Sequence, residues 1–162
     1  MNVTIRNMTK GDIASVQAIA RKTWDATYEG IIPREVQEKF LNSAYSDERM
    51  EYRMNNSHIF IAETSKKVIG FANFSPVNDK GEAELGAIYI YPEYQGAGVG
   101  TALLEKGIEG LEGIKKLYVH VEKDNEIGKA FYHAKGFQVI KEFDDDFDGH
   151  ILKTIQMVLE VE

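Results

Sequence analysis

Apolar residues recur along the chain with two different periods, and each period predicts a kind of element. Val3 and Ile5 alternate with polar residues, as in a short strand. Further strands are predicted over 59–62, 68–72, 82–91, 117–121, 137–140 and 151–161. Helical spacing predicts helices over 13–24, 33–41, 47–54, 101–111 and 126–134. This order predicts one α/β (α+β) domain over residues 1–162, with a mixed central sheet and flanking helices.

Capping signals support the boundaries of the first two helices. Thr9 can cap the first helix, and Asp12 can be its reciprocal partner in a shortened capping box. Pro33 is suited to open the second helix, because its fixed φ angle matches the helix. Residues 64–67 separate two strand candidates and predict a hairpin turn.

A glycine-rich turn, Gln95-Gly96-Ala97-Gly98-Val99-Gly100, separates the apolar run 87–91 from the helix predicted near Thr101. Glycines let the backbone approach a ligand closely, and the first amides of a helix have no partner within it. Those amides and the positive end of the helix dipole suit a phosphate or pyrophosphate. The turn therefore predicts a phosphorylated cofactor, with a ligand-free connector as the alternative.

The spacing of this turn excludes two common phosphate-binding motifs. A P-loop needs a lysine after its last glycine, and Gly100 is followed by Thr101, Ala102 and Leu103. A dinucleotide fingerprint counted from Gly96 places its third glycine on Thr101 and fails. The pattern that remains is Gln-x-x-Gly-x-Gly.

A second segment, residues 125–137, reads Asn-Glu-Ile-Gly-Lys-Ala-Phe-Tyr-His-Ala-Lys-Gly-Phe. Together the two segments resemble the GCN5-related N-acetyltransferase (GNAT) superfamily, over about residues 59–143. The sequence departs from that pattern at Gly128, where alanine is usual and the helix is loosened. The N-terminal part, with Trp24, Tyr28 and residues 30–33, is similar to a subset of bacterial members that includes polyamine acetyltransferases.

The resemblance implies acetyl-CoA as the cosubstrate and a way of holding it. Strands 82–91 and 117–121 would splay apart, and the pantetheine arm would pair with their free backbone groups. The amides of residues 96–101 would hold the pyrophosphate, and bulky side chains at Gly98 or Gly100 should block its approach. The expected cofactor-binding residues are Ile88, Tyr89, Ile90, Gln95, Gly96, Ala97, Gly98, Val99, Gly100, Thr101, Asn125 and Tyr132.

The implied reaction needs a base, because an alkylammonium with a pKa near 10.4 is almost wholly protonated at neutral pH. Glu84, at the start of the strand that leads to the turn, is the candidate base, with Glu82 as its rival. The alternative for Glu84 is a solvated carboxylate at a strand edge. No covalent intermediate is needed, since the amine can attack the thioester directly in a ternary complex.

The leaving thiolate needs a proton, and Tyr132 matches the tyrosine that serves as general acid in many members of the superfamily. The alternative is a core aromatic residue paired with Phe131. Asn125 would contact the pantetheine arm or only cap the following helix. Trp24 and Tyr28 would form acceptor-site walls or pack in the core, and His120 should flank the acyl site as a further substrate-binding residue.

The composition of the chain limits the classes of binding partner and the cellular location that can be expected. The chain has 162 residues, a net charge of −7 and a pI near 5.2, which argue against nucleic acid and mildly favour a cationic acceptor. No cysteine is present, the start lacks the apolar core of a signal peptide, and no apolar run is long enough for a membrane span. A cytoplasmic enzyme that does not bind membranes is expected, with a homodimer as a further expectation from the resemblance.

Metal binding is not expected. Residues 144–149 match the first six places of a calcium loop, but the twelfth place is Ile155 instead of glutamate. A solvated hairpin loop is the prediction there. The histidines, including His120, show no paired ligand spacing.

The sequence therefore predicts an acetyl-CoA-dependent N-acetyltransferase that acts on a small primary amine, with polyamines as the first hypothesis. Three alternatives stay open: a protein or peptide N-acetyltransferase, a non-catalytic acyl-CoA sensor, and an α/β domain without a cofactor. Tyr132 and Glu84 favour an enzyme, because binding alone requires neither of them.

Overall fold

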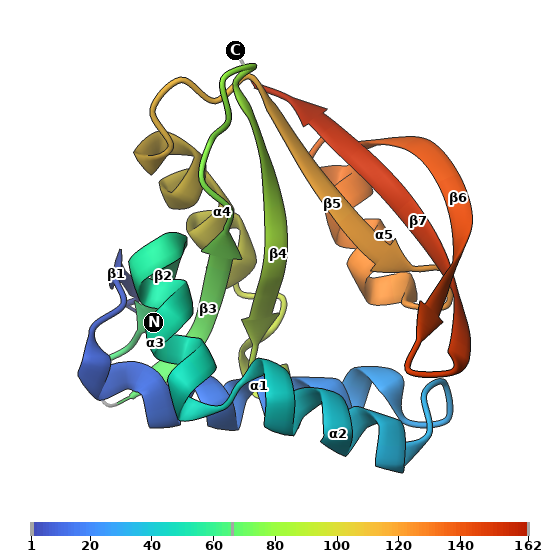
Figure 1. The fold of residues 1–162 in the computed structure, drawn as a ribbon. Helices are drawn as coiled ribbons and strands as arrows, with labels where there is room; N and C mark the ends of the chain where they lie inside the picture. The colour runs from blue at the N-terminus through green and yellow to red at the C-terminus, as the bar shows by residue number, and fades with distance from the viewer. Residues whose placement is uncertain (1, 66, 162) are drawn as a thin grey trace.

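The computed structural model describes residues 2–65 and 67–161, which form a twisted mixed sheet with helices on both faces (Figure 1). The strands are β1 (Thr4–Asn7), β2 (His58–Glu63), β3 (Val68–Phe74), β4 (Glu82–Ile90), β5 (Lys116–Glu122), β6 (Gln138–Phe147) and β7 (His150–Glu160). The helices are α1 (Ile13–Tyr28), α2 (Arg34–Ala44), α3 (Asp47–Asn56), α4 (Val99–Gly110) and α5 (Glu126–Ala134). Single 3₁₀ turns, η1 (Lys10–Asp12) and η2 (Pro92–Tyr94), precede α1 and follow β4.

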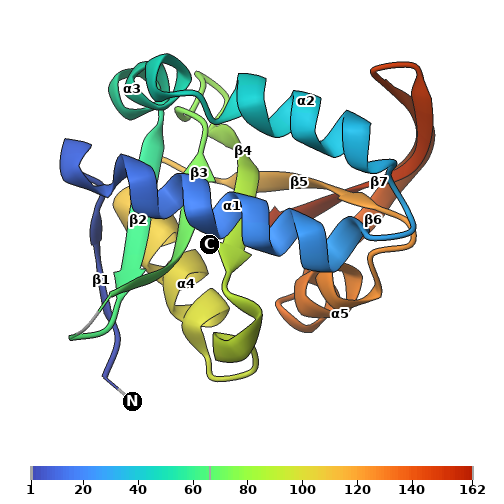
Figure 2. The ribbon, with the colours of Figure 1, turned by 90° about the horizontal axis from the view of Figure 1, so that it is seen from below.

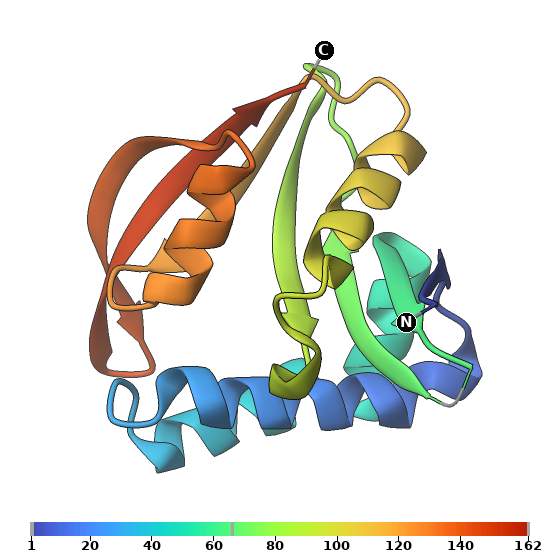
Figure 3. The same ribbon diagram turned by 180° about the vertical axis from the view of Figure 1, so that it is seen from behind.

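The sheet separates two hydrophobic clusters. Helices α4 and α5 cover the face seen in Figure 3, where Leu103 packs with Phe74 and Phe137. Helices α1, α2 and α3 cover the other face, where Val16 and Met50 are fully buried. Figure 2 shows α1 and α2 lying alongside each other beneath the sheet. The predicted α/β architecture with a mixed sheet is confirmed.

The strand order is β1-β2-β3-β4-β5-β7-β6, and among the strands of the described residues only β4 and β5 pair in parallel. Their pairing runs from Glu82 opposite Lys116 to Leu85 opposite Val119 and then stops, although both strands continue. Figure 1 shows the two strands diverging from this point toward α1. At the same place Gly86 is an extra residue in β4, because the register with β3 shifts there. The splayed pair implied by the resemblance is therefore present.

Most element boundaries agree with the sequence pattern. Thr9 and Asp12 form the expected capping box, Pro33 precedes α2, and α5 spans the predicted residues. Helix α4 differs, because it begins at Val99, two residues before the predicted start. Gly98 makes this early start possible by adopting a left-handed conformation, with φ of 84°, at the N-cap.

The prediction of a solvated loop over residues 144–149 is wrong in its extent. Strand β6 continues to Phe147, and only Asp148 and Gly149 form the turn, both with positive φ. Cross-strand pairing outweighs the low strand propensity of the aspartates, since Asp144 lies opposite Lys153 and pairs with it at 2.6 Å. The hairpin tip reaches α2, where Lys39 pairs with Asp148 at 3.2 Å.

Among the helices of the described residues, we find none with the length and apolar character needed to cross a bilayer.

Candidate active site

A cleft of about 800 Å³ opens where β4 and β5 part. Its walls come from the second half of α1, the outer part of β4, the glycine-rich turn with the start of α4, the end of β5, and α5. Most of the predicted site residues line it: Trp24, Tyr28, Ile88, Tyr89, Ile90, Gln95, Gly96, Gly98, Gly100, Thr101, His120, Asn125 and Tyr132. Ala97, Val99 and Glu84 are not among the lining residues.

The glycine-rich turn has the geometry of an anion cradle. Gly96 and Gly98 have φ angles of 81° and 84°, and a Cβ built on either one meets no atom within 4 Å. The first hydrogen bond of α4 runs from the Ala102 amide to the Gly98 carbonyl (3.0 Å), so the amides of 99–101 have no partner within the helix. Open space, free amides and the helix dipole coincide at this end of the cleft.

Gly100 is enclosed more tightly by the protein than Gly96 and Gly98 are. A Cβ on Gly100 lies 3.0 Å from the Phe131 ring and 3.2 Å from Ile90. A larger side chain would therefore collide with the protein itself before it met a ligand. Val99 is 2% exposed in the core, so only its backbone amide is available to the cleft.

The outer part of β4 offers unpaired backbone to the cleft. Beyond Leu85 this strand has no partner on its β5 side, while residues 87–90 keep their pairing with β3. The side-chain amide of Gln95 (Nε2) donates to the Ile90 carbonyl at 3.3 Å and fixes the turn to the strand end. The Tyr89 side chain is partly buried, and its hydroxyl accepts a hydrogen bond from Trp24 Nε1 at 2.9 Å.

Tyr132 and Asn125 lie on the opposite wall. Tyr132 is 8% exposed, packs against Phe131 and Phe137, and lines the cleft. Burial raises the pKa of its phenol well above the ordinary value, so it stays protonated at neutral pH. The Asn125 side chain caps α5 by accepting a hydrogen bond from the Gly128 amide at 2.9 Å, and the residue also lines the cleft. The two alternatives for Asn125, cap and site residue, are thus compatible.

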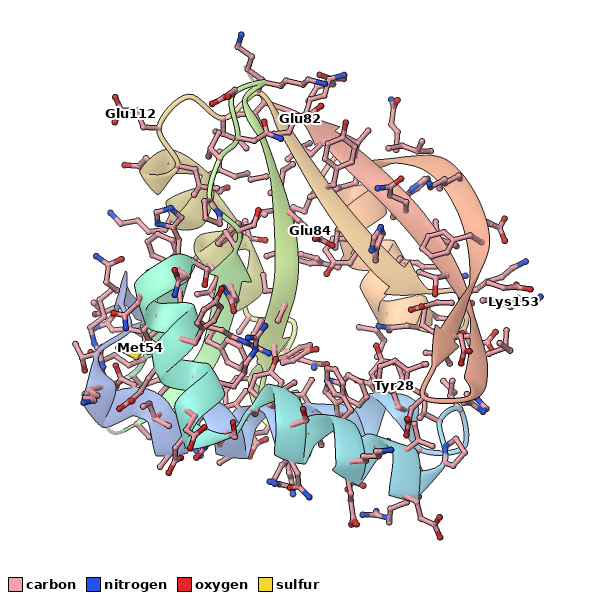
Figure 4. The ribbon with its side chains drawn as sticks, in the orientation of Figure 1. Tyr28, Met54, Glu82, Glu84, Glu112 and Lys153 are labelled. Atoms are coloured by element: carbon pink, nitrogen blue, oxygen red, sulfur yellow. The ribbon has the colours of Figure 1, made fainter. Side chains whose placement is uncertain are left out.

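Glu84 occupies the last paired stretch of β4, just before the strands part. Its carboxylate lies 3.4 Å from Nδ1 of His120, and the two side chains are 50% and 43% exposed. Figure 4 shows Glu84 in the wedge between β4 and β5, with Tyr28 at the wide end of that wedge. Glu82 lies nearer the strand junction and accepts a hydrogen bond from Tyr118 at 3.2 Å. Of the two glutamates, only Glu84 contacts a residue that lines the cleft.

Trp24 and Tyr28 combine packing with a position in the cleft. The indole is 5% exposed and stacks on Phe40, with ring centroids 4.5 Å apart, and Phe147 of the hairpin packs against both rings. Tyr28 packs against Trp24, and burial, followed by the charge of Glu122, raises the pKa of its phenol to about 12. Both residues therefore pack in the core and line the cleft, and their role as acceptor-site walls stays a prediction.

Sequence reasoning missed several polar residues in or beside the cleft, among them Thr23 and Glu122. Thr23 lines it from α1 and falls four residues after Ile19, so a hydroxyl on the apolar stripe of the helix was the available signal. Glu122 is 7% exposed at the end of β5, where burial raises the pKa of its carboxyl. Its Oε2 accepts the Asp124 amide at 2.6 Å and orders the connection to α5. Nothing in the local sequence distinguishes Glu122 from a surface glutamate.

Within residues 2–65 and 67–161, no group of three or more acidic or histidine side chains is placed to hold a metal ion.

The fold and the cleft together define an acyl-CoA N-acyltransferase. A sequence profile of the Acetyltransferase (GNAT) family matches residues 17–137. The chain is 31% identical to the spermidine N(1)-acetyltransferase of Thermoplasma acidophilum over 157 residues, 92% of this chain and 93% of that protein. It is 32% identical to the uncharacterized N-acetyltransferase YuaI of Bacillus subtilis, over 94% and 90% of the two chains.

The comparison with solved structures supports the same family. The crystal structure of the PaiA N-acetyltransferase from Thermoplasma acidophilum in complex with coenzyme A has a TM-score of 0.86 and 26% identity, over 99% of this chain and 100% of that one. The chain belongs to the acetyltransferase (GNAT) family. It is an acetyl-CoA-dependent N-acetyltransferase, and the free amides and open glycines of its cleft fit that cosubstrate.

Proposed function

We propose that this enzyme transfers the acetyl group of acetyl-CoA directly to a primary amine of a small polyamine, within one acetyltransferase domain formed by residues 1–162. The observation that carries the proposal is one continuous cleft. It joins an anion cradle at the start of α4, an unpaired strand edge on β4, and a buried tyrosine on α5.

The cosubstrate is proposed to lie along this cleft from cradle to tyrosine. The backbone around Gly98 and the first turn of α4 hold the pyrophosphate. The pantetheine arm pairs with β4 at residues 88–90, and Asn125 and Tyr132 face it from the α5 side. The amide near Ile90 polarises the thioester carbonyl. The volume of about 800 Å³ is within the range of sites for ligands of this size.

Glu84 is the proposed base. At pH 7 only about one alkylamine in a few thousand is neutral, so supplying the nucleophile costs roughly 4–5 kcal/mol unless a proton is removed near the reaction. Glu84 stands at the point where β4 and β5 part, and His120, 3.4 Å away, links it to the cleft. The proton moves from the ammonium to the Glu84 carboxylate, directly or through a water.

Tyr132 is the proposed acid. After the amine attacks the thioester carbonyl, the bond from carbon to sulfur breaks and the sulfur leaves as a thiolate. The Tyr132 phenol then donates its proton to that sulfur, and the extra proton on the attacking nitrogen, released as the neutral amide forms, returns to the Tyr132 oxygen and restores the phenol. Its burial keeps the phenol protonated over the working pH range and excludes competing water.

A cationic acceptor suits the charge of the site. The net charge is −7, and Glu84 and Glu82 lie on the strand that leads into the cleft. Trp24 and Tyr28 provide aromatic walls against which an alkyl chain or a cation can lie. The Thermoplasma relative is named for its action on spermidine, which supports the same class of acceptor here.

The test is release of free CoA from acetyl-CoA across a panel of amines. The panel holds spermidine, spermine, putrescine, a monoamine of matched length and a peptide with a free N-terminus. We expect the highest kcat/KM for a polyamine, with the monoamine at least tenfold lower, because it lacks the distant charges. Preference for the peptide would overturn the polyamine assignment and favour a protein substrate. Binding of acetyl-CoA without turnover on any amine would overturn the mechanism.

We further propose that the reaction takes place in the cytoplasm, where acetyl-CoA is available. A homodimer stays a prediction from the family resemblance.

A further inference from the structure

Thr23 of α1 has a buried hydroxyl for which the described residues provide no hydrogen-bond partner. The residue is 6% exposed, and its Oγ1 is inaccessible to solvent. A helical threonine commonly satisfies its hydroxyl by bonding a carbonyl of the preceding turn, and Thr23 does not. An unpaired buried hydroxyl lowers stability, so its presence points to a partner that binds later.

The position of Thr23 indicates what that partner is. Thr23 lines the cleft, as do Tyr89 and Ile90. Those two residues belong to the stretch of β4 that has no β5 neighbour. The adjacent Trp24 fixes α1 to this stretch through its 2.9 Å hydrogen bond to the Tyr89 hydroxyl. Figure 3 shows α1 passing below the end of β4, and α4 and α5 lie on either side of that strand.

We propose that the Thr23 hydroxyl, which protein atoms enclose in this structure, turns toward the cleft when acetyl-CoA binds and becomes a hydrogen-bonding contact for its pantetheine arm. This inference rests on the proposed course of the arm along β4. The arm carries amide groups and a hydroxyl, which are neutral and can pair with a single buried hydroxyl. The acceptor ammonium is a poorer match, because a charge buried beside a neutral hydroxyl lacks the anionic partner that it needs. Thr23 thus extends the cosubstrate site onto the first helix.

The test compares Thr23→Val, which keeps the shape of the side chain, with Thr23→Ser, which keeps the hydroxyl. Calorimetry without any amine should show acetyl-CoA affinity falling about threefold to tenfold in Thr23→Val, the range for one neutral hydrogen bond. Thr23→Ser should retain most of the affinity. Without ligand, Thr23→Val should melt no lower than the unchanged protein, because it removes an unsatisfied buried oxygen.

Thr154→Val is a matched control. Thr154 is also 6% exposed, but it lies on β7 outside the cleft, and its hydroxyl donates to the Leu152 carbonyl at 3.4 Å. Its substitution should leave acetyl-CoA affinity unchanged. Adenosine 3′,5′-bisphosphate, which lacks the arm, is the second probe, and Thr23→Val should bind it as tightly as the unchanged protein does.

Three results overturn the inference. They are unchanged acetyl-CoA affinity in Thr23→Val, an equal loss for both probes, or an effect confined to the KM of the amine. These outcomes are separable from the proposed function. The binding measurements contain no amine, so failure of polyamine turnover leaves them standing. Failure of the Thr23 test leaves polyamine acetylation untouched.

Discussion

The substitution Gly98→Ala can separate the effect of backbone strain on stability from the effect on ligand binding. It can do so because another glycine of the chain, Gly113, has nearly the same conformation. Gly98 and Gly113 have φ angles of 84° and 81°, and a Cβ on either one meets no protein atom within 4 Å. Gly98 lines the cleft, whereas Gly113 lies in the connection between α4 and β5, away from it. The two substitutions should therefore cost the same stability and differ only in binding.

The magnitudes follow from the geometry. A left-handed non-glycine residue costs about 1–2 kcal/mol. For a chain of this size, that lowers the melting temperature by about 2–8 °C in both variants. At Gly98 the new methyl group occupies the space proposed for the pyrophosphate. Each charge-assisted hydrogen bond lost there is worth about 1.5–3 kcal/mol, which weakens binding by one to two orders of magnitude.

The assay is calorimetric titration of acetyl-CoA into each variant, with thermal melts of the ligand-free proteins as the measure of strain. We expect similar melting temperatures for Gly98→Ala and Gly113→Ala, and weakened binding only in the first. If Gly98→Ala binds acetyl-CoA within about twofold of the unchanged chain, the turn is not the pyrophosphate site and the placement of the cosubstrate is wrong.

Three further outcomes are expected. Tyr132→Phe should lower kcat about 100-fold, the low end for a lost general acid, with unchanged acetyl-CoA binding in calorimetry; an unaltered kcat would remove its acid role. Glu84→Gln should lower kcat/KM for the amine by a similar factor in the CoA-release assay, whereas Glu82→Gln, two pairs nearer the strand junction, should have little effect; equal losses would contradict the assignment. Arg6 lowers the pKa of Asp12 to about 2, so the ionised carboxylate stabilises the fold above about pH 4, and this contribution is lost as the pH falls toward 2. Asp12→Asn should therefore unfold in urea with a free energy lower by about 2 kcal/mol at pH 7, and a difference that did not shrink at pH 3 would argue against this ion pair.

The elements that the sequence predicts well are those whose signals are local. Helix α5 has its capping residue Asn125 and a periodic apolar stripe, so both of its ends could be placed. The start of α4 was placed two residues late because it depends on the left-handed conformation of Gly98, which the sequence permits but does not require. The extent of β6 was underestimated because its aspartates are held by pairing with β7, a contact between strands that local propensity does not contain.

The candidate site divides in the same way. The glycine-rich turn and the segment around Tyr132 could be found because each is a contiguous motif. The pairing of Glu84 with His120 depends on the parallel register of β4 and β5, which only the folded sheet determines. The unpaired state of the Thr23 hydroxyl is an absence of contacts, and it becomes visible only once α1 is packed against β4.

The four residue pairs that join β4 to β5 are a narrow seam in an otherwise continuous sheet. On one side lie β1 to β4, and on the other lie β5, β7 and β6. In the proposed arrangement, acetyl-CoA lies between β4 and β5 where the two strands are no longer paired. The cosubstrate then joins the two half-sheets as well as supplying the acetyl group. Bound ligand adds to folding stability by an amount that rises with the logarithm of its free concentration above Kd, so the cellular supply of acetyl-CoA then influences the lifetime of the enzyme as well as its rate.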